Sequence, residues 1–95
     1  MTDIHSTAVI EDGAQIGADV EVGPYCVISA NAIIGDGAKL KSHVVIDGHT
    51  KIGSGCNIFP FACIGAQTQD LKFSGGVTYV EVGDNTTIRE NVTIN

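Results

Sequence analysis

The chain has 95 residues, which is room for one small domain. Aromatic residues make up only 5% of it and tryptophan is absent, so its 43% of hydrophobic residues must build a largely aliphatic core. The net charge of −6 and the five scattered basic residues argue against a nucleic acid or an anionic membrane as partner, because phosphate groups are bound by clustered lysine and arginine.

The beginning of the chain and its cysteines narrow the class further. Residues 1–5 contain neither the basic stretch nor the apolar stretch of a secretory signal, and every apolar run is far shorter than the roughly twenty residues of a membrane-spanning helix. We therefore expect a cytoplasmic protein that is not an integral membrane protein. The three cysteines include no Cys-x-x-Cys pair, so they indicate neither a disulfide framework nor a zinc site.

A six-residue repeat runs through the chain from Ile4 onward. Every sixth residue is isoleucine, valine or leucine, apart from an interruption at Asp70 and Gly76. The members are Ile4, Ile10, Ile16, Val22, Ile28, Ile34, Leu40, Ile46, Ile52, Ile58 and Ile64, then Val82, Ile88 and Ile94. A second series, four residues further along each hexad, holds only small or β-branched residues: Ala8, Ala14, Val20, Cys26, Ala32, Ala38, Val44, Thr50, Cys56, Ala62, Thr68, Thr86 and Val92.

This period predicts an all-β solenoid. A repeat of six does not match an amphipathic helix, but it fits short strands separated by turns, with both series pointing inward. Gly17, Gly35 and Gly53 lie eighteen residues apart, as a coil of three hexads requires, and we expect them at corners with a sharp bend or a positive φ. The prediction is a parallel β-helix of about five coils, a single domain over residues 1–95. The chain stops just after an inward Ile94 without a cap, so we expect a longer protein truncated at its C-terminal end.

The repeat fails between Thr68 and Val80, which predicts one protruding loop near residues 69–79. Loops that leave a solenoid usually lie on its binding face. This one carries an amide, an acid, a lysine and two aromatic residues, and these groups suit a polar ligand or a neighbouring subunit. The alternative is a solvated excursion with Phe73 and Tyr79 packed against the coil.

Histidines and cysteines are the other candidates for chemistry. His43 and His49 occupy equivalent places in successive hexads, so they should project from adjacent faces about 120° apart and cannot share a metal ion within one chain. We interpret them as polar surface residues. Cys26 and Cys56 fall at inward positions and Cys63 faces outward, and none has a base paired with it in the sequence, which leaves nucleophilic catalysis unsupported.

Five segments carry a resemblance to a known family. Residues 40–53, Leu-Lys-Ser-His-Val-Val-Ile-Asp-Gly-His-Thr-Lys-Ile-Gly, resemble the corresponding part of the acyl-[acyl-carrier-protein]–UDP-N-acetylglucosamine O-acyltransferases, which belong to the hexapeptide-repeat acyltransferases. The resemblance continues at residues 4–10, 61–65, 69–73 and 88–94, so it spans essentially the whole chain. The loop sequence Gln-Asp-Leu-Lys at 69–72 is its most specific part.

The resemblance implies a left-handed winding and a homotrimer with an active site in each cleft between neighbouring β-helices. The implied reaction moves a 3-hydroxyacyl chain from acyl-carrier protein to the glucosamine 3-hydroxyl of UDP-N-acetylglucosamine, the first step of lipid A biosynthesis, with no cofactor and no metal. Asp70 and Lys72 would bind and orient the UDP-sugar, with Gln69 beside them. The general-base histidine is expected downstream of Asn95, so this chain holds no catalytic residue and should be inactive alone. Residues 75–78, Gly-Gly-Val-Thr, depart from the Gly-Glu-Pro-Thr common in the family.

Other functions remain open on the residues alone. One is the related N-acyltransferase of the same pathway, which usually carries an extra N-terminal domain, whereas the hexads here begin at Ile4. A second is a metal protein similar to the γ-carbonic anhydrases, which needs three imidazoles converging across a subunit boundary. A third is a purely structural solenoid, in which the loop has no binding role.

Overall fold

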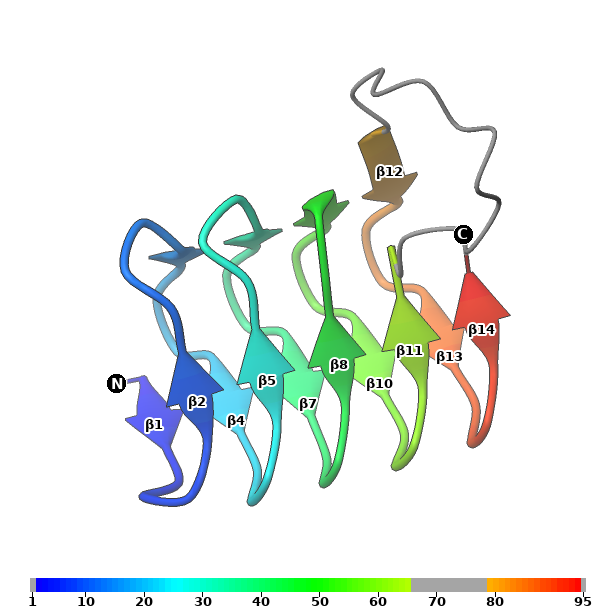
Figure 1. Ribbon diagram of the computed structural model, residues 1–95. Coiled ribbons are helices and arrows are strands. Elements are labelled where there is room, and N and C mark those ends of the chain that lie inside the picture. The colour runs from blue at the N-terminus through cyan, green and yellow to red at the C-terminus, as the bar shows by residue number, and fades with distance from the viewer. Residues whose placement is uncertain (1, 66–78, 95) are drawn as a thin grey trace, which may run out of the picture.

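The computed structural model describes residues 2–65 and 79–94, and it forms a parallel β-helix in which three sheets make the three sides of a solenoid (Figure 1). The first sheet holds β1 (Asp3–Ile4), β4 (Glu21–Val22), β7 (Lys39–Leu40), β10 (Asn57–Ile58) and β13 (Thr87–Ile88). The second holds β2 (Val9–Ile10), β5 (Val27–Ile28), β8 (Val45–Ile46), β11 (Cys63–Ile64) and β14 (Thr93–Ile94). The third holds β3 (Gln15–Ile16), β6 (Ile33–Ile34), β9 (His49–Ile52) and β12 (Tyr79–Val82).

All strand pairs are parallel, and their register confirms the coil length read from the sequence. Ile28 pairs with Ile46, so one coil takes eighteen residues. Across the interruption, Ile58 pairs with Ile88, a separation of thirty. The difference is twelve residues, or two hexads. For this reason the aliphatic series resumes in phase after the loop and the core continues without a shift.

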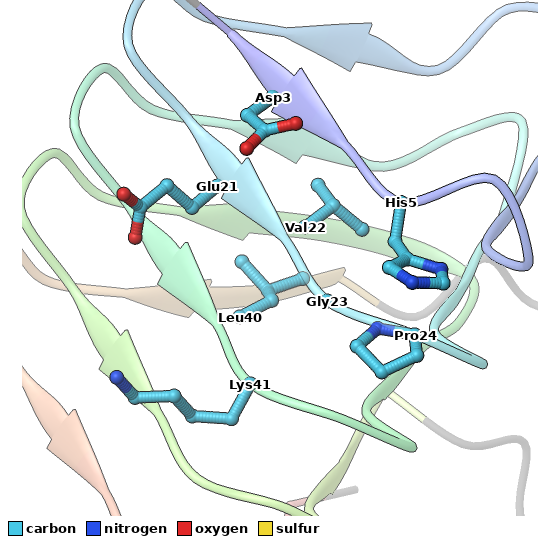
Figure 2. Close-up of a pocket in the computed structure, with 8 residues that line it drawn as sticks. All are labelled: Asp3, His5, Glu21, Val22, Gly23, Pro24, Leu40 and Lys41. Carbon is cyan, nitrogen blue, oxygen red and sulfur yellow. The ribbon is translucent and has the colours of Figure 1, made fainter.

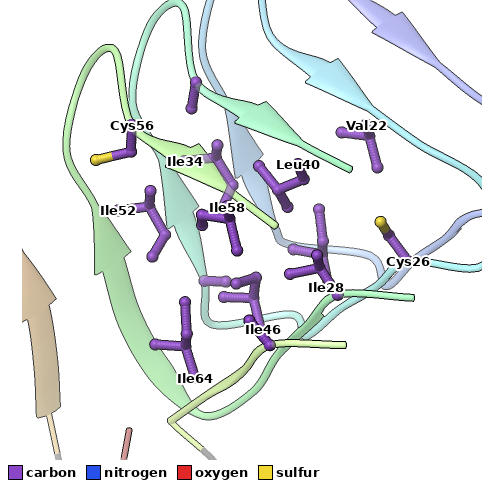
Figure 3. Close-up of a cluster of buried hydrophobic side chains, with 14 of the residues drawn as sticks. Val22, Cys26, Ile28, Ile34, Leu40, Ile46, Ile52, Cys56, Ile58 and Ile64 are labelled. Atoms are coloured by element: carbon purple, nitrogen blue, oxygen red, sulfur yellow. The ribbon is translucent and has the colours of Figure 1, made fainter. Parts of the chain in front are cut away.

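The core consists of the two inward series, as the alternation of strand side chains predicts (Figure 3). Ten residues of the large series, from Val22 to Ile64 together with Val82 and Ile88, are buried. Small residues such as Cys26, Ala38 and Val44 fill the space between them and are 0% exposed. At the first coil nothing described stacks on the outer side, and Ile4 is accordingly 41% exposed.

The repeated glycines are required by close approach of the next coil, and at most of these positions not by a positive φ. A Cβ at Gly35 would lie 2.7 Å from the carbonyl carbon of Gly53 and 2.7 Å from the amide nitrogen of Ser54. At Gly17 and Gly53 an added Cβ would meet the carboxylate of Asp36 or Asp84 first and then backbone atoms of the next coil. Among the glycines that follow an aliphatic residue, only Gly65 has a positive φ, of 77°. The left-handed conformation instead falls mainly two positions later, at the two corners that border the first sheet: Asp19, Tyr25, Gly37, His43, Gly55, Phe61, Asn85 and Asn91.

Within the described ranges, no helix is long and apolar enough to cross a membrane.

Candidate functional site

Gln69, Asp70 and Lys72, the residues expected to bind the sugar nucleotide, lie outside the described residues, as does Phe73. The structure does describe both ends of that segment. The chain leaves the second sheet after β11 and re-enters the third sheet at β12. Placing Tyr79 in the loop was wrong: Tyr79 begins β12 and pairs with His49. The reason is that β9 is four residues long, so its first two residues pair with Tyr79 and Val80.

A polar corner at residues 47–50 lies close against Gly65, where the chain leaves the solenoid. The hydroxyl of Thr50 donates a hydrogen bond to the carbonyl oxygen of Asp47 at 2.6 Å, and the Ser29 hydroxyl donates to the carbonyl oxygen of Gly48 at 3.0 Å. The Gly65 amide donates to the carbonyl oxygen of Ile94 at 2.6 Å. A side chain at Gly65 would collide with both the Thr50 hydroxyl and the Asp47 carbonyl group. The loop is therefore attached to the solenoid at a tightly packed position.

The point where the loop returns carries two aromatic side chains that contact each other. The His49 and Tyr79 rings have centroids 5.2 Å apart and planes tilted by 53°. His49 is half-buried and Tyr79 is 74% exposed. Next along the same two strands, Lys51 pairs in register with Glu81, and both face solvent. An imidazole, a phenol, an ammonium group and a carboxylate thus lie at the root of the loop, where they offer hydrogen-bond donors and acceptors to a polar ligand.

His43 lies at a different corner, between the first and second sheets, and it is not an isolated polar residue. Its ring stacks between Tyr25 and Phe61, with centroid distances of 5.1 and 4.9 Å. The three residues are eighteen apart, so each occupies the same place in its coil. The separation of His43 from His49 agrees with the expectation that they project from different places. The stack itself was missed, although the eighteen-residue spacing of three ring-bearing residues was visible in the sequence.

A surface hollow of about 340 Å³ lies on the opposite side of the solenoid, along the first sheet. Figure 2 shows His5 and Pro24 on one side of it and Glu21 and Lys41 on the other. The first sheet is the side facing away from the corner between the second and third sheets, where the loop leaves. The hollow and the loop are thus two separate places, and the hollow adds nothing to the site that the sequence predicted.

The cysteines lie where the repeat predicts. Cys26 and Cys56 are buried, and Cys63 is half-buried on the outer side of β11. Burial raises the pKa of the Cys26 thiol above 9.0, its ordinary value, so this group stays protonated near neutral pH. Among the described residues, no three histidine, cysteine, aspartate or glutamate side chains gather as metal ligands would.

Comparison with curated proteins finds relatives that share one name. The chain is 51% identical over 94 residues to an acyl-[acyl-carrier-protein]–UDP-N-acetylglucosamine O-acyltransferase of Thermodesulfovibrio yellowstonii, covering 99% of this chain and 36% of that protein. It is 50% identical over 93 residues to the protein of the same name from Mesorhizobium japonicum, covering 98% of this chain and 33% of that protein. The chain therefore spans about a third of the length of the curated relatives it matches.

A solved structure and a family profile agree with these relatives. The crystal structure of a UDP-N-acetylglucosamine acyltransferase from Bacteroides fragilis superposes with a TM-score of 0.91 at 48% identity, over 97% of this chain and 36% of that one. This likeness confirms the left-handed parallel β-helix. The profile of the bacterial transferase hexapeptide family (six repeats) matches residues 1–34 and 13–48, together just over half of the 95 residues. The chain belongs to the bacterial transferase hexapeptide family.

Proposed function

We propose that the protein containing this chain transfers a 3-hydroxyacyl group from acyl-carrier protein to the glucosamine 3-hydroxyl of UDP-N-acetylglucosamine, the first step of lipid A biosynthesis. The observation that carries the proposal is the 51% identity to a protein named for acyl-carrier protein and UDP-N-acetylglucosamine, which extends over 99% of the chain. An alignment of that extent includes the non-repetitive segment 66–78 as well as the hexads. Hexads alone would support only a transferase of the same fold.

The proposal assigns substrate binding to Gln69, Asp70 and Lys72. On an extended segment, residues 70 and 72 point to the same side and can contact one ligand together. The ammonium group of Lys72 donates to sugar or phosphate oxygens, and the carboxylate of Asp70 accepts a hydrogen bond from a sugar hydroxyl. The tight attachment of the segment at Gly65 supports this assignment, because a fixed root limits where the segment can reach.

The remaining parts of the proposal concern residues and subunits outside this chain. We expect a neutral histidine downstream of Asn95 to take the proton from the attacking hydroxyl, since an imidazole near neutral pH can accept it as the thioester is attacked. We expect a homotrimer, located in the cytoplasm, that completes each site between neighbouring subunits. At residues 75–78 this chain reads Gly-Gly-Val-Thr where the family commonly has Gly-Glu-Pro-Thr, so it lacks an acid and a proline of the family there.

The assignment is tested by Asp70→Ala and Lys72→Ala in the full-length gene product. Loss of one charge-assisted hydrogen bond, worth about 1.5–3 kcal/mol, predicts a roughly ten- to hundred-fold lower kcat/KM for each variant. The melting temperature should hardly change, because neither residue is part of the inward series. Lys39 is an exposed lysine on the first sheet, so Lys39→Ala is the matched control and should keep full activity. Wild-type activity in both loop variants, or activity lost only through unfolding, would show that the loop is structural.

A further inference from the structure

We propose that the pair Asp47 and Gly48 is a site of spontaneous covalent modification, where Asp47 converts to isoaspartate through a cyclic succinimide. The reaction needs no enzyme and no reactant other than water. It follows from the hydrogen bonds around the Asp-Gly pairs of this chain and does not depend on acyl transfer.

The sequence contains three Asp-Gly pairs, at residues 12–13, 36–37 and 47–48. Glycine has no Cβ, so its amide nitrogen is less hindered than that of other residues when it approaches the preceding side chain. In all three pairs the glycine has a positive φ and the pair lies at a corner between strands. All three aspartates are exposed to solvent. Sequence and exposure therefore do not distinguish the three pairs, and the hydrogen bonds must decide between them.

At Asp47 the two reacting groups already contact each other. The Gly48 amide donates a hydrogen bond to Oδ1 of Asp47 at 2.8 Å. This bond closes a small ring, which holds the amide nitrogen close to Cγ, the carbon that bears Oδ1. Reacting atoms held about 3–3.5 Å apart need little further ordering before they react. Among the described residues, no backbone carbonyl accepts a hydrogen bond from the Gly48 amide, so nothing there draws the nitrogen away from the carboxyl group.

At Asp36 the corresponding groups are held apart by the preceding coil. The Gly37 amide donates to the carbonyl oxygen of Ala18 at 2.9 Å, and the Ala18 amide donates to Oδ1 of Asp36 at 2.8 Å. Both hydrogen bonds must break before the Gly37 nitrogen can reach the carboxyl group. Within the described ranges, residues 12–13 show neither the reactive contact nor this restraint. We therefore expect Asp47 to react fastest and Asp36 slowest.

The reaction is an isomerisation in two steps. Ring closure joins the Gly48 nitrogen to Cγ of the Asp47 carboxylic acid, and the amide proton leaves with the carboxyl hydroxyl as water. Water then adds to one of the two ring carbonyl carbons, and the C–N bond at that carbon breaks. Breakage at Cγ restores aspartate. Breakage at the main-chain carbonyl carbon leaves the peptide bond on Cγ and a free carboxylate on Cα, which is isoaspartate.

The modification would change the polar corner at residues 47–50. It lengthens the main chain by a methylene group, and the Asp47 carbonyl oxygen that accepts the Thr50 hydroxyl at 2.6 Å becomes part of a free carboxylate. The Ser29 hydroxyl, which donates to the Gly48 carbonyl oxygen at 3.0 Å, must follow the displaced chain. Thr50 and Ser29 are buried, so poorer pairing of their hydroxyl groups lowers stability. The isoaspartate form, separated by chromatography, should therefore unfold at a lower urea concentration, and an equal midpoint would contradict this consequence.

The test follows the three pairs in the full-length gene product, incubated in heavy-oxygen water near neutral pH. Each succinimide takes up one heavy oxygen atom when it opens, and electron-transfer fragmentation of the peptides distinguishes isoaspartate from aspartate. In the folded protein, the peptide with residues 47–48 should gain label at least about tenfold faster than the peptide with residues 36–37, because two hydrogen bonds must break at the latter pair. In urea the three pairs should react at similar rates, since the unfolded chain lacks these contacts.

Asp47→Glu is the matched variant, because it keeps the negative charge but places the carboxyl carbon one bond further from the Gly48 nitrogen. It should abolish labelling at this corner, whereas Asp36→Glu should leave the labelling of Asp47 unchanged. Folded wild-type protein in which residues 12–13 or 36–37 react as fast as residues 47–48 would overturn the inference. So would an Asp47 that reacts more slowly in the folded protein than in urea. Because the readout is the chemistry of these peptides, failure of the acyl-transfer assay would leave the result unaffected.

Discussion

Replacing Gly35 by alanine tests whether the coils are as close as the structure places them. The added Cβ would lie 2.7 Å from two backbone atoms of the next coil and 2.9 Å from the Ile52 carbonyl oxygen, which accepts a hydrogen bond from the Gly35 amide. Ordinary contacts of such carbons begin near 3.5 Å, so the two coils must separate by several tenths of an ångström. Overpacking of this kind costs about 1–3 kcal/mol, and the stretched hydrogen bond adds about 1 kcal/mol. We expect Gly35→Ala to lower the free energy of unfolding by about 3 kcal/mol.

Gly37 offers a matched control two residues away. Its φ is +73° and the nearest atom to an added Cβ is 3.9 Å away, so Gly37→Ala meets backbone strain without a collision. The expected cost is about 1 kcal/mol. Urea denaturation followed by circular dichroism measures both variants in the full-length gene product. If Gly35→Ala proves no more destabilising than Gly37→Ala, close approach of the coils does not explain the glycine repeat.

Three further changes are expected to have measurable effects. Ile46→Ala in the centre of the core should cost about 2–5 kcal/mol in the free energy of unfolding, whereas Ile4→Ala, at a position 41% exposed, should cost less than about 1 kcal/mol; equal losses in denaturant titrations would contradict this core. Gly65→Ala should both destabilise the protein and reduce acyl transfer, because it displaces the point where the loop leaves the solenoid. Unchanged activity would show that the position of the loop does not matter for the reaction. Because the folded protein holds the Cys26 proton more tightly than the unfolded chain, stability should fall as pH rises above about 9.0, and denaturation at successive pH values should show a weaker fall in Cys26→Ala.

Most of the fold follows from the two inward series, because each residue has the same environment in every coil and periodicity alone identifies it. Ile28 and Ile46 illustrate this, since the sequence predicts both their burial and their pairing. The reason for the glycines was less predictable. Close approach depends on the distance between successive coils, and that distance cannot be read from the six-residue repeat of the sequence.

The candidate site is where periodicity stops, and so prediction from the residues became less complete. The hexads located the interruption but not its end, because the pairing of Tyr79 with His49 depends on the unusual length of β9. The roles of Asp70 and Lys72 come from a family resemblance, and they stay a prediction. The stack around His43 could have been found from spacing, but stacking also requires three residues in the left-handed conformation at one corner.

The acyl-transfer reaction tests the proposed function most directly. The full-length gene product would be incubated with UDP-N-acetylglucosamine and a labelled 3-hydroxyacyl-acyl-carrier protein, and the product would be analysed by mass spectrometry. We predict one acyl group, joined through an ester to the glucosamine 3-hydroxyl. Transfer of an acetyl group from acetyl-CoA to a different acceptor, with no reaction of the acyl-carrier protein, would contradict the proposal.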